Sequence, residues 1–477
     1  MGRSCRNWDN ATLRFPVRST PHGENPMPSV TNPPGPRNRY PGSHLLAFRR
    51  DPLGFLTQVA RKHGDIVHGR LGRTHLYLLN HPDYIHDVLV TSHRRFTGLA
   101  FEAGKCLTGE GLLSAQGAVH HRHRRLMQPA FHHDRLWAYG ATMVKHMQRW
   151  CDGQRDGTVK AIRSEMRQLT LGIVGETMFG ATDGTAADDV RELIDAGGAL
   201  FGPLTFLFPF ARLMERLPLP SARRFVAARE RLDARIYRML RERRLSGLDR
   251  GDLLSMLLLA KDEEDALQGL TDHQIRDEVV TIFLAGHETT ASALTWSWEL
   301  LAQHPEAEGR LQAEIEEVLG DRPPTPNDLS CLPYTGGVFA EALRLYPTAA
   351  MIFRRALEDH AVGDYVIPKG GIVILSQYVM HRDSRFYPNP DVFDPGRWTP
   401  ELRASRPRYC YFPFGGGPRV CIGEGFATME GVLALASIAQ RWSLRLHGAP
   451  PLQRDPRLGT RPSDGLCLRL ESRVPSR

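Results

Sequence analysis

One long stretch of helical sequence limits the possible folds more than any other feature of the chain. The segment TDHQIRDEVVTIFLAGHETTASALTWSWELLAQHP runs from Thr271 to Pro305. Thr271 and Gln274 form a capping-box pattern at its start, and Pro305 predicts its end. About thirty helical residues, each rising about 1.5 Å, span about 45 Å. We therefore expect a helix that crosses a whole domain.

The rest of the sequence predicts a mainly α fold with small β-sheets packed on the helices. The periodicity of residues 117–320 is mostly helical. Residues 65–81 predict two strands around a Gly-Arg turn, and short strands with a proline-rich meander follow Pro347. A last helix is expected over about 423–442. Because we find no internal repeat and no long linker after the first 42 residues, we treat residues 33–477 as one unit.

Composition argues against several classes of protein. No run of about 18 apolar residues occurs, so no membrane-spanning helix is expected. Residues 1–32 are polar and proline-rich and lack the apolar core of a signal peptide, which predicts a disordered leader. The seven cysteines share no C-x-x-C spacing, which argues against disulfides, a cysteine zinc site and a ferredoxin-like cluster. We expect a reduced, cytoplasmic protein that is a monomer.

The net charge of +8 predicts a basic surface. Such a surface attracts nucleic acid, anionic lipid or an acidic protein. We find neither zinc-finger spacing nor an aromatic-and-basic ribonucleoprotein pattern, so no nucleic-acid partner is expected.

The centre of the long helix carries the hexapeptide AGHETT at residues 285–290. Gly286 costs up to about 1 kcal/mol relative to alanine in mid-helix. Thr289 can hydrogen-bond to a carbonyl one turn earlier and loosen the helix there. One interpretation is a packing glycine in a core helix. The other is a groove for a small ligand, in which Glu288 and Thr289 transfer protons.

A second motif joins an acid and a base on one short helix. In VFAEALRLYP, Glu341 and Arg344 are three residues apart and share a helix face. Such pairs are common on surface helices, where they contribute little. Arg397 lies some fifty residues later in the loop FDPGRW. A buried Glu-Arg-Arg cluster would need full hydrogen bonding, and it would then lock this loop in place.

The segment FPFGGGPRVCIGEGFA places a single cysteine, Cys421, after a glycine-rich loop. The start of the following helix and the nearby Arg419 are both expected to lower the pKa of its thiol. A free cysteine is usually a buried structural residue. The two reactive alternatives are a nucleophile and a metal ligand. A nucleophile needs a histidine base, which this neighbourhood lacks, so ligation of a haem iron fits better.

Together these motifs resemble the cytochrome P450 family, and in particular its soluble bacterial members. The pattern F-x-x-G-x-R-x-C-x-G is complete at residues 414–423, and AGHETT matches the oxygen-activation groove of the family. The E-x-x-R motif is present, and Arg397 stands where its third partner falls. The resemblance implies the triangular, mainly helical P450 fold with its long central helix across the haem. It assigns residues 33–477 to the haem domain.

The resemblance also implies a role for each motif. Cys421 would be the axial thiolate ligand of a b-type haem. Glu288 and Thr289 would be the acid–alcohol pair that supplies protons during oxygen activation. Glu341, Arg344 and Arg397 would hold the loop under the haem. The other haem-binding residues that it implies are His120, Arg124, Ala285, Gly286, Arg354, Phe414, Gly415, Arg419 and Gly423.

The two haem propionates need cations. Arg124 and Arg419 match family contacts, and Arg354 is the expected third cation, with Arg355 as the alternative one residue along. His120 stands where the family often has tryptophan, although imidazole can still donate to a carboxylate. A second departure is the pair Gly336-Gly337 before Glu341, which leaves the length of that helix open.

The function implied is that of a monooxygenase, which inserts one oxygen atom from O2 into a lipophilic small molecule. The apolar stretches 199–213 and 347–353 indicate a hydrophobic pocket. Terpenoids, fatty acyl chains, steroids and macrolides all fit such a pocket, and we expect a terpenoid or fatty acyl substrate. The first stretch is either a buried loop or an apolar lid. The remaining alternatives are a haem-thiolate isomerase, dehydratase or peroxygenase, a non-catalytic gas-binding protein and, last, a cysteine hydrolase.

Electrons would come from a separate protein, because the chain carries no flavin or iron–sulfur signature. A ferredoxin and its NAD(P)H-dependent reductase are the expected source. A basic patch near the thiolate would steer an acidic donor to this face. Its expected members are Arg122, Arg125, Arg403, Arg406 and Arg408.

Overall fold

The computed structural model describes most of the chain from Asn32 onwards. It covers residues 32–37, 43–71, 74–99, 102–180, 217–260, 269–448, 460–462 and 465–473, with six further positions between 189 and 200. Residues 1–31 of the predicted leader and nearly all of the apolar stretch 199–213 lie outside these ranges.

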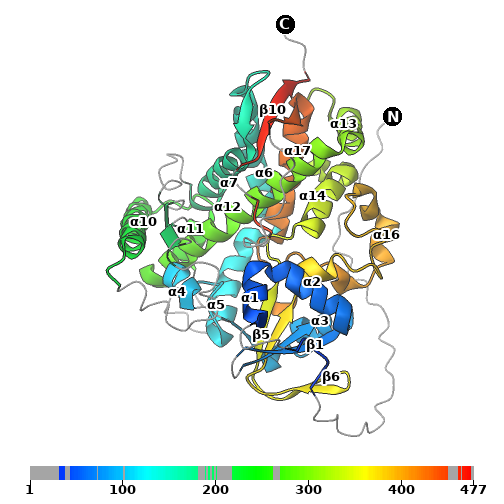
Figure 1. Cartoon of the computed structure of the whole chain (residues 1–477). Coiled ribbons are helices and arrows are strands. Elements are labelled where there is room, and N and C mark those ends of the chain that lie inside the picture. The colour runs from blue at the N-terminus through cyan, green and yellow to red at the C-terminus, as the bar shows by residue number, and fades with distance from the viewer. Residues whose placement is uncertain are drawn as a thin grey trace.

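A long helix runs through the centre of the molecule, as predicted (Figure 1). This helix, α12, spans Asp272–Gln303 and is about 48 Å long. Thr271 Oγ1 accepts from the backbone N–H of Gln274, and the Gln274 side chain accepts from the backbone N–H of Thr271, at 3.2 and 3.0 Å. The helix ends before Pro305, which lacks an N–H and instead opens the next helix.

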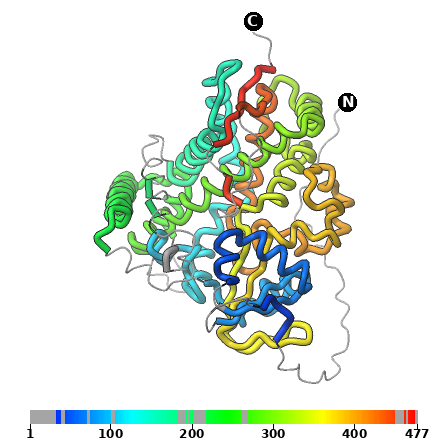
Figure 2. Tube along the Cα trace, in the orientation of Figure 1, coloured from blue at the N-terminus to red at the C-terminus, as the bar shows by residue number. Residues whose placement is uncertain are grey.

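Helices pack around α12 and form the larger part of the core. Helix α7 lies along α12, while α6 packs against the C-terminal α17 (Figure 2). The apolar residues of α17 that are buried in this core include Phe426, Met429, Leu433 and Ala436. The main helices are α4 (Glu102–Thr108), α5 (Gly117–Met127), α6 (His133–Asp152), α7 (Ile162–Phe179), α10 (Pro220–Ser246), α11 (Leu253–Leu259), α13 (Pro305–Leu319), α14 (Pro333–Leu345) and α17 (Glu424–Arg441).

Three small sheets complete the described structure, and the mainly α prediction is confirmed. The largest has the order β1-β2-β8-β5-β3, in which β2 and β8 are parallel and the other pairs antiparallel. Helices α1 (Ser43–Arg50) and α2 (Pro52–His63) lie near it (Figure 1). The strands are β1 (Ile66–Leu71), β2 (Thr74–Leu79), β3 (Phe96–Gly98), β4 (Val159–Ala161), β5 (Ile352–Ala356), β6 (His360–Val362), β7 (Tyr365–Ile367), β8 (Ile372–Leu375), β9 (Trp442–Leu446) and β10 (Cys467–Ser472).

Short helices and helical turns connect the longer helices and the strands. They are α3 (Pro82–His86), η1 (Asp87–Thr91), η2 (His93–Arg95), η3 (Gln128–Phe131), η5 (Pro326–Cys331), α15 (Gln377–Met380), η6 (Pro395–Trp398), α16 (Pro400–Ala404), η7 (Arg408–Cys410) and η8 (Gly417–Arg419). None of the helices in the described ranges has the length and hydropathy needed to cross a membrane.

One of the two glycines before Glu341 has a packing reason, while a Cβ atom on the other, Gly336, would meet nothing within 4 Å. Helix α14 begins at Pro333, so both glycines are helical and the helix is not shortened. A Cβ atom on Gly337 would lie 2.8 Å from the carbonyl oxygen of Pro395. The missing side chain therefore lets η6 approach α14 closely, which outweighs the low helix propensity of glycine.

Candidate functional site

The loop before Cys421 depends on glycine for its shape. Gly415 and Gly417 have φ angles of +77° and +65°, which L side chains rarely adopt. A Cβ atom on Gly417 would lie 1.8 Å from the carbonyl oxygen of Leu89, so this close approach also requires glycine. The backbone N–H of Cys421 donates to the carbonyl of Phe414 at 2.9 Å. The loop thus holds Cys421 just ahead of α17.

Cys421 is exposed, unlike the other cysteines in the described ranges, which are buried or partly buried. The expectation of a lowered thiol pKa was wrong for the protein alone. Desolvation raises the pKa of Cys421, and Glu424 adds to the rise, while the N–H of Gly423 and the charge of Arg124 oppose it. The thiol is accessible from one side, yet surrounding protein shields the thiolate from water. Coordination to a metal would deprotonate such a thiol outright.

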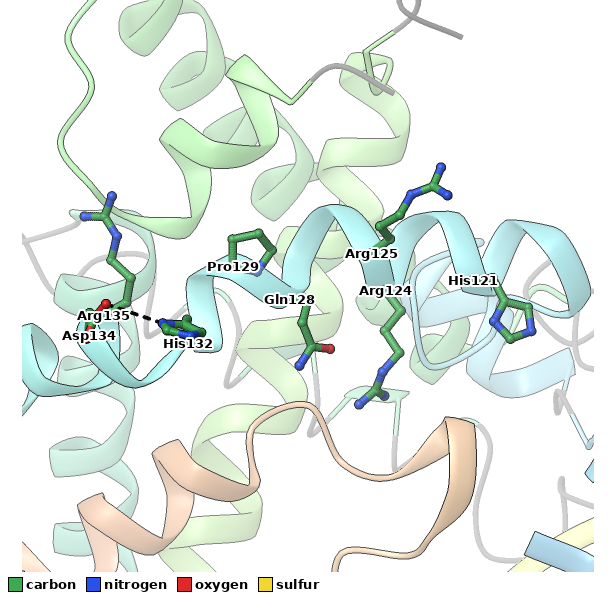
Figure 3. Close-up of a pocket in the computed structure, with 8 residues that line it drawn as sticks. All are labelled: His121, Arg124, Arg125, Gln128, Pro129, His132, Asp134 and Arg135. Carbon is green, nitrogen blue, oxygen red and sulfur yellow. Dashed lines mark ion pairs between the residues drawn. The ribbon is translucent and has the colours of Figure 1, made fainter. Parts of the chain in front are cut away.

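Two of the predicted cations are anchored beside the Cys421 loop. Arg124 Nη1 donates to the carbonyl of Val420 at 2.6 Å. Figure 3 shows the Arg124 side chain pointing from α5 toward the ribbon of the C-terminal segment. Arg419 Nη2 donates to the carbonyl of Ala115 and to Gln116 Oε1, at 2.7 and 2.9 Å. These bonds bring α5 and the loop together.

Arg354 is the third cation of this group. It is partly buried in β5, whereas Arg355 is exposed, so Arg354 is the arginine that faces inward. Burial and the nearby Arg419 lower the pKa of Arg354 to about 10. Burial also lowers the pKa values of Arg124 and Arg419. Within the described part of the chain, none of the three forms an ion pair with a carboxylate.

His120 lies among these positive charges. It is 4% exposed, and burial, followed by Arg419, His121 and Arg124, lowers its pKa to about 4. The ring is therefore neutral near pH 7. Three shielded guanidinium groups without a counter-charge, close to an accessible thiol, suit a flat group with two carboxylates and a metal that binds sulfur. These residues fit a haem.

The AGHETT segment turns two of its side chains toward open space. Ala285 and Thr289 are exposed, one turn apart on α12, and Thr289 Oγ1 donates to the carbonyl of Ala285 at 2.6 Å, as predicted. Gly286 has a packing role, because a Cβ atom there would lie 3.0 Å from Val174 of α7. Thr290 is buried and donates to the carbonyl of Gly286 at 3.3 Å. The two adjacent threonines, about 100° apart around the helix, thus face different surroundings, one exposed and one buried.

Glu288 is held by arginines that the sequence did not reveal. Arg163 Nη2 lies 2.6 Å from Glu288 Oε1, and Arg167 Nε lies 2.9 Å from Oε2. Arg461 Nε adds a third contact at 3.4 Å. No hydrogen bond joins Glu288 to Thr289 in the described contacts. The two residues are adjacent in sequence, but the structure does not bring acid and alcohol together.

The Glu-Arg-Arg cluster forms as predicted. Arg344 donates to both oxygens of Glu341, at 2.7 and 2.8 Å, and neither residue is exposed. Arg397 Nε lies 3.4 Å from Glu341 Oε1. Trp398 Nε1 also donates to Glu341, at 2.9 Å, a contact that the motif did not predict. Arg344 further binds the carbonyls of His381, Pro390 and Val392, so the cluster fixes the meander.

The five arginines of the expected basic patch have different environments. Arg403 and Arg408 are exposed, and both act on the carboxyl group of Glu424, three residues after Cys421. Arg406 is engaged within the meander, where it binds the carbonyl of Leu402 at 2.9 Å and stacks on two aromatic rings.

Arg125 is exposed and leaves α5 on the side opposite Arg124 (Figure 3). Both arginines line a surface depression of about 700 Å³. The other lining residues are His121, Gln128, Pro129, His132, Asp134 and Arg135.

Comparison with known proteins identifies the class that this fold and loop define. The family model described as Cytochrome P450 matches residues 33–468, and the chain belongs to that family. Members of the family hold a haem and act on O2, and the chain is a P450 monooxygenase.

Two relatives come from Streptomyces melanosporofaciens. Cyclooctatin synthase is 40% identical over 84% of this chain and 87% of its own length. Cyclooctat-9-en-7-ol 5-monooxygenase is 37% identical over 84% and 87%. Pentalenene oxygenase from Streptomyces avermitilis is 34% identical over 84% and 88%.

Solved structures agree with this assignment. The cytochrome P450DA heme domain matches with a TM-score of 0.83 and 28% identity, over 94% of this chain and 99% of that one. A retinoic acid-bound cyanobacterial CYP120A1 matches with a TM-score of 0.80 and 25% identity, over 93% and 100%.

Proposed function

We propose that this chain, with residues 33–477 as its haem domain, oxygenates a polycyclic terpenoid. The observation that carries the proposal is its identity of 34–40%, over 84% of its length, with enzymes named for cyclooctatin, cyclooctat-9-en-7-ol and pentalenene. Fatty acyl substrates are the weaker alternative. We expect an apolar pocket that suits the hydrocarbon skeleton of a terpenoid. The reaction would add a hydroxyl group to that skeleton.

In this proposal Cys421 is the axial ligand of a b-type haem. The glycine loop presents the thiol, and Phe414, Gly415 and Gly423 shape its surroundings. Arg124, Arg354 and Arg419 would pair with the two propionates. The propionates would supply the negative charges that these guanidinium groups do not find among the described residues. Neutral His120 would donate one further hydrogen bond. Bound there, the haem would supply the reductive activation of O2.

The chain itself supplies proton control on the exposed face of α12. Thr289 holds its hydroxyl beside the open space through its bond to Ala285, so it can pass on a proton or orient a water molecule. Ala285 keeps that side of the helix narrow, while Gly286, expected from the family to line the same groove, packs against Val174 of α7. Glu288 would take part only after leaving its arginine partners. Glu341, Arg344 and Arg397 remain structural, because they touch the meander and not the open space.

Electrons would come from an acidic ferredoxin-type protein that an NAD(P)H-dependent reductase reduces. The exposed Arg403 and Arg408, near Glu424 and Cys421, are the best-placed steering charges. We propose a cytoplasmic monomer, in keeping with the absence of paired cysteine spacings in the sequence.

Two spectra and one assay test this function. The reduced protein with carbon monoxide should show a strongly red-shifted Soret band that Cys421→Ala abolishes. Titration with a polycyclic terpene alcohol should perturb the Soret band of the oxidised protein at lower concentration than a long-chain fatty acid does. Turnover should require NAD(P)H, ferredoxin and reductase. Turnover without electron donors would instead support an isomerase, dehydratase or peroxygenase. No turnover of either substrate, with or without electron donors, would favour a gas-binding protein.

A further inference from the structure

A buried histidine lies between the Glu341–Arg344 pair and the Cys421 loop. His381 follows the short helix α15 and has no exposed surface. Its ring contacts Tyr411 and Phe412, with centroids 5.0 and 5.5 Å away. None of the sequence motifs described above includes this residue.

His381 makes one hydrogen bond on each side. Its Nε2 accepts from the backbone N–H of Phe412 at 3.0 Å. Its own carbonyl accepts from Arg344 Nη1 at 2.9 Å. The same residue therefore contacts the E-x-x-R arginine through its backbone and the start of the cysteine segment through its ring.

The ring can serve as an acceptor because it stays neutral. Burial, followed by the charges of Arg344 and Arg382, lowers the pKa of His381 well below its usual value. A neutral imidazole that accepts at Nε2 carries its proton on Nδ1. The carbonyls of Leu343 and Arg344 act on the ring as acceptors, although neither forms a hydrogen bond of normal geometry with Nδ1.

Two backbone bonds continue from Phe412 to the thiol. The carbonyl of Phe412 accepts from the N–H of Gly415, and the carbonyl of Phe414 accepts from the N–H of Cys421, both at 2.9 Å. The backbone N–H of Phe412 is shielded from water, because Phe412 is only 3% exposed. Without an acceptor at His381, this N–H would be buried and unsatisfied, which favours another conformation of the loop.

We propose that His381 is a positioning residue, which anchors the Cys421 loop to the Glu341–Arg344 pair and so holds the thiol in its ligating position. This inference rests on the proposed function, in which Cys421 binds the haem iron. In this proposal His381 acts as a hydrogen-bond acceptor, in addition to packing as a buried ring. Substitutions can separate the acceptor role from the packing role.

The test compares a variant that keeps the ring with one that keeps the acceptor. His381→Phe preserves an aromatic ring but removes Nε2. His381→Gln removes the ring but offers an amide oxygen at similar reach. Tyr387→Phe is the matched control, because it deletes a buried hydrogen bond in the same meander, from the Tyr387 hydroxyl to the carbonyl of Cys410 at 3.2 Å.

The readout is the absorption spectrum of each reduced protein with carbon monoxide, in lysate and after purification. In His381→Phe we expect the ratio of the red-shifted band to the shorter-wavelength band to fall about fivefold or more. His381→Gln should recover most of this ratio, and Tyr387→Phe should keep it. A His381→Phe protein with the wild-type ratio would overturn the proposal, as would a His381→Gln protein no better than His381→Phe.

If His381→Phe yields no haem-containing protein, His381→Gln decides the question. A red-shifted band in that variant supports the acceptor, and only a shorter-wavelength band overturns it. Failure of the underlying function looks different, because Cys421→Ala would then keep the red-shifted band that the wild-type protein shows.

Discussion

Arg163 and Glu288 form an ion pair across the interface between α7 and α12, with Arg163 Nη2 2.6 Å from Glu288 Oε1. Arg163 is 2% exposed, so the negative charge of Glu288 stabilises a guanidinium group that is shielded from water. Arg167, one turn along the same helix, binds the other carboxylate oxygen. This clamp fixes the register of α7 against α12 next to Thr289, and it directs the acid away from the alcohol.

The clamp predicts a loss of stability in Glu288→Gln. The amide is neutral, so buried Arg163 would lose the negative charge of Glu288 at 2.6 Å, and the free energy of unfolding should fall by about 1–3 kcal/mol. Urea unfolding followed by circular dichroism measures this change. Glu317→Gln, on the exposed side of α13, should stay within about 0.5 kcal/mol of the wild type. Equal losses in the two variants would contradict the clamp.

The different surroundings of two neighbouring threonines, Thr289 exposed and Thr290 buried, predict different effects on coupling. In Thr289→Ala the exposed hydroxyl is lost, and product formed per NAD(P)H consumed should fall roughly tenfold or more, with hydrogen peroxide released instead. Thr290→Ala removes a hydroxyl that is 2% exposed and bound to the carbonyl of Gly286. Its coupling should remain near that of the wild type. Full coupling in Thr289→Ala would remove the role assigned to this residue.

Local features of the site were predictable from sequence, because neighbouring residues determine them. The capping box at Thr271 and the glycines before Cys421 meet steric and hydrogen-bonding demands within a few residues. The partners of Glu288 were not predictable, because Arg163 and Arg461 lie more than a hundred residues away in either direction. Two arginines one turn apart on a predicted helix usually lie on its solvated face. Their spacing alone therefore does not indicate a buried acidic partner.

The acidity of Cys421 was mispredicted for a related reason. The N–H of Gly423, at the start of the following helix, does favour the thiolate as expected, and the favouring charge is that of the distant Arg124, where the sequence had indicated Arg419. Desolvation outweighs them, and it depends on how closely the whole fold surrounds the loop. The role of His381 was missed because its acceptor serves a backbone N–H, which no side-chain pattern reveals.

The buried His120 predicts how the stability of the haem-free protein depends on pH. Its pKa is about 4 when folded, against about 6.5 in the unfolded chain. Between these values the unfolded state binds more protons, so stability is full above about pH 6.5 and falls toward pH 4, by at most about 3 kcal/mol from this group. His120→Gln should reduce the slope. His381 and His287, whose pKa values are also lowered, keep some of it.

Unfolding by urea at several pH values measures that slope. In the wild type, bound haem should also reduce the dependence of stability on pH, because propionates beside His120 would favour the protonated form of its ring. A His120→Gln protein with an undiminished slope would show that the ring does not stay neutral in the folded state. A wild-type slope that haem leaves unchanged would place the propionates elsewhere.

The two exposed arginines beside Glu424 predict how the electron donor docks. In Arg403→Glu/Arg408→Glu, like charges would face an acidic ferredoxin, and the KM for ferredoxin should rise about tenfold at low salt while the haem spectrum stays unchanged. The dependence of this KM on ionic strength should also weaken, because screened attraction is what salt removes. Arg238→Glu on α10 is the control, since this exposed arginine lies outside the Cys421 region. If Arg238→Glu raises the KM for ferredoxin equally, the net charge of the protein attracts the donor. The local charges of Arg403 and Arg408 would then not determine where the donor docks.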